Sequence, residues 1–62
     1  MEPVAVAIAN DRIEKVLASP DVHFFAKKVI REALLYDPVD AVHDLRLAFD
    51  VIRQHTDALL TQ

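Results

Sequence analysis

The chain contains no glycine, no cysteine and no tryptophan, and its aromatic residues are three phenylalanines and one tyrosine. Without cysteine, it can form neither a disulfide nor a thiolate metal site. Without glycine, it has no residue specialised for the left-handed conformation that commonly ends a helix, and no glycine-rich loop to hold a phosphate. We therefore expect short connections between its elements, and we expect no cofactor and no nucleotide-binding site.

The chain is also short for an independently stable domain. A domain of 62 residues buries only about 60% of the surface that its unfolded chain exposes, so it is marginal as a monomer. Disulfides, a structural metal or a second subunit usually support domains of this size. Because cysteine is absent, association is the support that we expect, and the sequence predicts a homodimer.

Long apolar runs and an excess of positive charge are missing as well. The longest apolar stretch, residues 4–9, is far shorter than the roughly 20 residues of a membrane-spanning helix. The first residues show no basic region ahead of an apolar run, as a secretory signal would. The formal net charge is −3, which gives no overall attraction to nucleic acid or anionic lipid. We expect a cytoplasmic protein with no membrane partner.

Two of the three prolines lie in patterns that typically start a helix, Ser19-Pro20-Asp21 and Asp37-Pro38. In both, a side-chain oxygen at the cap position can accept a backbone N–H, and the proline follows where its missing N–H costs nothing. A residue before proline also avoids the helical conformation, so each pattern should end one helix sharply. The sequence predicts three helices in one small domain, at residues 3–18, 20–36 and 38–60.

The third predicted helix carries two apolar lines. The first, called the seam here, has alternating spacings of three and four residues: Val42, Leu45, Phe49, Ile52, Thr56 and Leu59. This spacing suits a short coiled coil, and it suits a helix in an antiparallel bundle better. The second line is formed by Leu47, Val51 and Ala58. Two apolar lines on one helix predict two neighbouring elements, one packed against each line. Between the two lines, Arg46 with Asp50 and Arg53 with Asp57 are spaced to pair one turn apart on solvated flanks.

The second predicted helix has an apolar face that suits the third. This face contains Val22, Phe25, Ala26, Val29, Ala33 and Tyr36, widened by Ile30 and Leu34. We therefore expect an all-α fold dominated by an antiparallel hairpin of the second and third helices. At ~1.5 Å per residue the third helix would be roughly 34 Å long and the second roughly 25 Å, so the third should overhang. The hypothesis is a dimeric helical bundle that associates through Leu47, Val51, Leu59 and Leu60.

The first segment is ambiguous at residues 4–9, where alternating valine, isoleucine and alanine fit a strand as well as a helix. Pro3 and the abundant alanine favour a helix from the start. A strand followed by helices would resemble the ribbon-helix-helix DNA-binding pattern. Its exposed face would present alanine or aliphatic groups instead of the hydrogen-bonding side chains that read bases. We therefore do not expect DNA binding by that route.

The best candidate for chemistry is Asp40-x-x-His43-Asp44, because the spacing places a carboxylate and an imidazole on adjacent turns of one helix. A metal site of this kind in a bundle normally takes further carboxylates from facing helices, and Glu14 and Glu32 are the internal glutamates available. We interpret the cluster as a solvated helix flank and expect no metal.

Nucleophilic catalysis has less support. Ser19 is explained as a helix cap, and no cysteine or glycine-rich oxyanion loop is present. His23 lies in the first turn of its predicted helix without a partner. His55 flanks the seam, and we interpret it as a polar residue on that flank. A small chain also has little room for a substrate pocket. We predict no catalytic residue and no enzyme.

One outward surface of the second predicted helix is unusual because it mixes cations with large apolar groups. We call this set the mixed surface: Phe24, Lys27, Lys28, Arg31 and Leu35. It predicts a non-catalytic regulatory module that acts as a homodimer and presents this surface to another protein. The alternative function is a small dimeric nucleic-acid-binding regulator that uses the same cations, doubled by symmetry.

Overall fold

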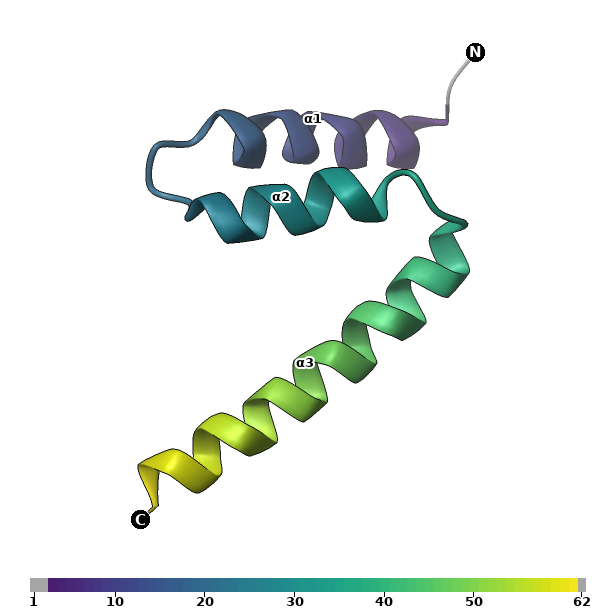
Figure 1. Cartoon of the computed structure of the whole chain (residues 1–62). Coiled ribbons are helices and arrows are strands. Elements are labelled where there is room, and N and C mark those ends of the chain that lie inside the picture. The colour runs from purple at the N-terminus through teal and green to yellow at the C-terminus, as the bar shows by residue number, and fades with distance from the viewer. Residues whose placement is uncertain (1–2, 62) are drawn as a thin grey trace. The chain divides into compact units, whose positions relative to one another are not determined.

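The computed structural model describes residues 3–61 and contains three helices (Figure 1). They are α1 (Val4–Ala18), α2 (Phe24–Ala33) and α3 (Pro38–Leu60). No strand is present within residues 3–61, so the predicted all-helical class is confirmed. Residues 4–9, which the pattern left open between helix and strand, belong to α1.

The chain divides into two compact units. The first ends at Glu32 and holds α1 with nearly all of α2, and the second begins at Ala33 and holds α3. The predicted hairpin of α2 with α3, and the predicted dimer, therefore stay predictions. Each unit is described separately below.

α1 begins directly after Pro3, whose carbonyl oxygen accepts hydrogen bonds from the amides of Val6 and Ala7, both at 3.1 Å. Its alanine content supports the helical conformation through the stretch that also fits a strand. The helix ends at Ser19, which is extended with φ −73° and ψ 127°. This extended conformation is the one that a following proline imposes.

The segment between α1 and α2 differs from the prediction. The helix expected from residue 20 begins at Phe24, because residues 20–22 form a turn and a bend. The Ser19 hydroxyl accepts from the amide of Asp21 at 3.2 Å. This bond to the second residue along closes a local turn. The serine therefore stabilises the connection, and the amide of Lys27 bonds the carbonyl of His23 as α2 begins.

α2 also ends earlier than the expected residue 36. Its last residue is Ala33, and Leu34 to Tyr36 form a turn in which the Tyr36 amide bonds the Ala33 carbonyl at 3.2 Å. The physical reason lies at Asp37, which precedes a proline and is extended with φ −57° and ψ 130°. Residues 34–36 therefore leave the helical conformation before the extended Asp37.

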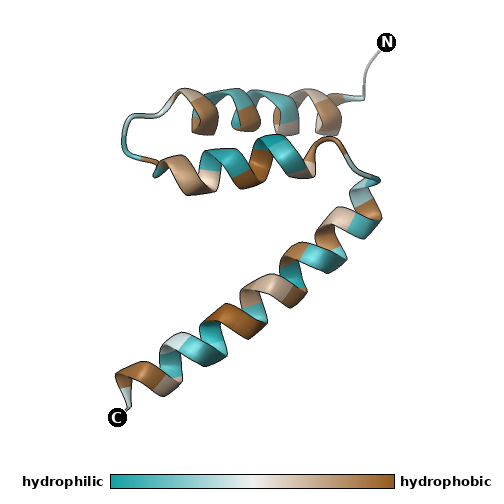
Figure 2. Cartoon of the chain, in the orientation of Figure 1, coloured by the Kyte–Doolittle hydropathy of each residue, from teal (hydrophilic) through white to brown (hydrophobic). Residues whose placement is uncertain are grey.

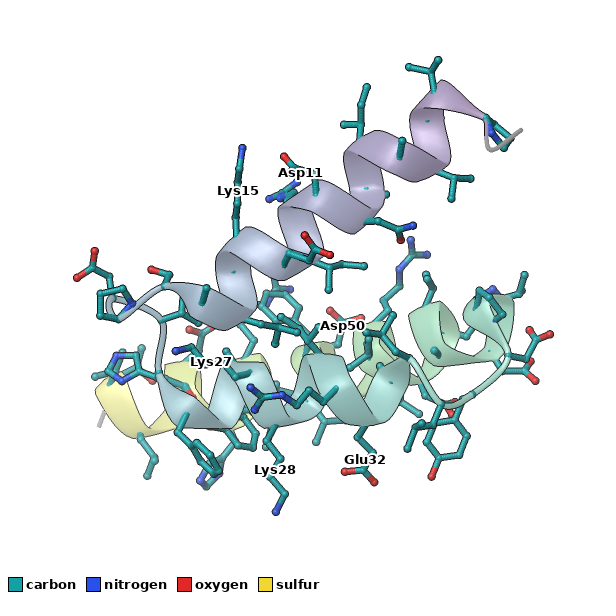
Figure 3. All side chains as sticks on the ribbon, turned by 90° about the horizontal axis from the view of Figure 1, so that it is seen from above. Asp11, Lys15, Lys27, Lys28, Glu32 and Asp50 are labelled. Atoms are coloured by element: carbon teal, nitrogen blue, oxygen red, sulfur yellow. The ribbon has the colours of Figure 1, made fainter. Side chains whose placement is uncertain are left out.

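The apolar contact of the first unit lies between α1 and α2, which run antiparallel (Figures 1 and 3). Its half-buried apolar residues are Ile13, Val16 and Leu17 from α1, Val22 from the connection, and Ala26, Val29 and Ile30 from α2. No residue within 3–61 is fully buried. Two short helices share a narrow line of contact, so this unit has no deep core.

Three residues predicted on the core face lie outside it. Phe25 is 76% exposed, Tyr36 is 61% exposed and Leu34 is 56% exposed. The half-buried line of α2 passes through Ala26 and Val29, and Phe25 lies roughly 100° around the helix from Ala26. Leu34 and Tyr36 follow the end of α2, so the helical spacing no longer applies to them.

α3 has a well-formed start. One carboxylate oxygen of Asp37 accepts from the amides of Val39 at 3.0 Å and Asp40 at 3.2 Å. Pro38 occupies the first turn, and the Asp40 carboxylate lies in that same turn, where the helix dipole favours negative charge. At the other end, the Thr61 hydroxyl donates to the Asp57 carbonyl at 3.0 Å.

We expect Asp37→Ala to lower the free energy of unfolding by about 1 kcal/mol, because two amides of α3 lose their acceptor. Thermal unfolding followed by circular dichroism at one fixed protein concentration measures the change. Asp37→Asn is the matched control, since its amide oxygen can still cap the helix. Equal melting temperatures for the alanine variant and the wild type would contradict the role of this cap.

Candidate interaction surfaces

The seam is uncovered within its own unit, because α3 is the sole helix of that unit within the described residues. Its large apolar side chains range in exposure from 40% for Leu45 to 62% for Phe49 and Ile52. Figure 2 shows hydrophobic segments repeating along α3 between hydrophilic ones. A single helix cannot bury its own side chains, so the seam requires another helix as a neighbour.

The second line is uncovered too, with Leu47 64% exposed and Val51 56% exposed. These two residues lie one turn apart on the same side of α3. Leu59 lies roughly 120° around the helix from Leu47, and Leu60 lies on the opposite side from Val51. The four residues predicted for self-association therefore do not share one face. Leu59 belongs to the seam and Leu60 adjoins it, whereas Leu47 and Val51 belong to the second line.

The flank beside the seam carries charges that are not paired along the helix. Within residues 3–61, no ion pair joins Arg46 to Asp50 or Arg53 to Asp57. The Arg53 guanidinium instead lies over the Phe49 ring, 5.7 Å from its centroid. The ion pair that forms is Lys15 with Asp11 on α1, at 2.9 Å.

The structure keeps part of the mixed surface together. Phe24 is 74% exposed, and Lys28 and Arg31 are exposed on α2 at helical spacing from it. Lys27 is half-buried and lies on the side of α2 that faces α1, as Figure 3 shows. Leu35 follows the end of α2 and belongs to the second unit.

Two residues near the mixed surface were missed by the sequence reasoning. Glu32 points away from α1 on the same side as Lys28 (Figure 3) and lowers the net positive charge there. Phe25 was assigned to the core, yet it is as exposed as Phe24. The sequence could have placed Glu32 beside Lys28, because residues four positions apart are neighbours on one side of a helix.

The residues considered as metal ligands, Asp40, His43 and Asp44, lie on α3. Within residues 3–61, no group of three or more histidines or carboxylates is arranged to hold a metal ion. His43 borders two shallow depressions on α3, one with Arg46, Leu47 and Asp50 and the other with Pro38, Val39 and Val42. Residues of α3 alone line both, so they are surface grooves of that helix.

Among the described residues, no helix has the length and apolar content needed to cross a bilayer. Comparisons with protein-family models, curated proteins and solved structures returned no match. The features of the described residues that bear on function are therefore the exposed apolar lines of α3 and the mixed surface.

Proposed function

We propose that the protein is a non-catalytic helical interaction module that acts as a homodimer through α3 and presents the mixed surface to a second protein. The observation that carries this proposal is that α3, a helix of 23 residues, forms its own unit while bearing apolar side chains on two sides. A helix of this kind is stabilised by packing against another helix more than by its intrinsic propensity.

Burial of the apolar seam contributes more free energy than ion pairing on the flank. Burying one valine, leucine, isoleucine or phenylalanine fully is worth about 1.5–3 kcal/mol. An exposed ion pair on the flank is worth only about 0.2–1 kcal/mol. The apolar side chains of the seam therefore provide the affinity for a neighbouring helix. The charges influence which neighbour fits.

The mixed surface favours a protein partner over nucleic acid. Nucleic-acid binding draws its affinity from several cations that each neutralise a phosphate. Here Lys27 is half-buried and Glu32 lies beside Lys28, so the local positive charge is small. Exposed Phe24 suits the apolar centre of a protein interface, with Lys28 and Arg31 available to carboxylates around it. We propose an acidic protein as the partner.

Phe24→Glu tests this surface, and Val4→Glu on α1 is a matched control because the two side chains are 74% and 76% exposed. We expect Phe24→Glu to reduce recovery of the bound protein by about tenfold, as expected for loss of an interface anchor. Val4→Glu should bind like the wild type. Affinity capture from native lysate, followed by quantitative mass spectrometry, measures both.

The same capture is repeated after nuclease treatment. We expect unchanged recovery, since the proposed partner is a protein. Loss of the bound material after nuclease, with affinity falling steeply as salt rises, would replace the proposal with the nucleic-acid regulator. Equal recovery by Phe24→Glu and the wild type would remove the mixed surface from the account.

A further inference from the structure

We draw no further inference here: the strongest candidate, the exposed apolar seam along α3 with its charged flank, carries no further proposal because nothing in the structure shows what covers it.

Discussion

Phe49→Glu is expected to raise the dissociation constant of the homodimer by about 100-fold or more, which corresponds to ~3 kcal/mol. The side chain lies near the middle of the seam, and two-fold symmetry introduces the change on both chains at once. Each glutamate would be a charge in an apolar interface without a partner. The substitution also removes the ring that Arg53 covers. Sedimentation equilibrium over a concentration series measures the dissociation constant.

Gln54→Glu is the matched control, since it adds the same residue to the same helix on the side away from the seam. We expect its dissociation constant to stay within a few-fold of the wild type, as is usual for exposed substitutions. A Phe49→Glu protein that dimerises like Gln54→Glu would exclude the seam. Weaker association after Leu47→Glu, with Phe49→Glu unchanged, would assign the interface to the second line.

Ile30→Asp is expected to separate α1 from α2 and to lower the melting temperature of the first unit by about 10 °C, on the scale of 4–8 °C per kcal/mol for domains of this size. Ile30 is half-buried in the apolar contact with α1. Its replacement removes part of that contact and places a charge beside Ile13, Val16 and Leu17. Far-ultraviolet circular dichroism should show the loss of helix.

Ile8→Asp makes the same change at a residue that is 65% exposed on α1. We expect it to melt within a few degrees of the wild type, because it removes little contact. Similar destabilisation by both variants would mean that the α1–α2 contact is not what holds the first unit together. The thermal melts are run at one protein concentration, since association shifts apparent stability.

The positions of Pro20 and Pro38 in the sequence predicted where the helices are interrupted. The two interruptions differ in local structure, and the sequence pattern does not show this difference. At Asp37 one carboxylate oxygen accepts from the amides of both Val39 and Asp40, so a helix starts there. The Ser19 hydroxyl accepts from the Asp21 amide, and the chain turns before α2 begins. Serine and aspartate are both good helix caps by residue type, so the pattern alone does not separate the cap at Asp37 from the turn at Ser19.

The apolar pattern predicted which faces need neighbours and left the identity of each neighbour open. The line through Ala26 and Val29 was predicted to pack on the third helix, and in the structure it meets α1 within the first unit. An apolar stripe fits several neighbours equally well, because burial is not directional. For the same reason, the self-association set combined Leu47 with Leu59, although a regular helix places them on different sides.

The molecular mass of the wild-type chain in solution tests the central claim most directly. Sedimentation equilibrium from micromolar to millimolar concentration should show a species at twice the 7.0 kDa of one chain, with a monomer appearing on dilution. This result is expected because α3 bears more apolar surface than a lone helix can cover. A mass of 7.0 kDa at every concentration would contradict the homodimer and the proposed function that depends on it.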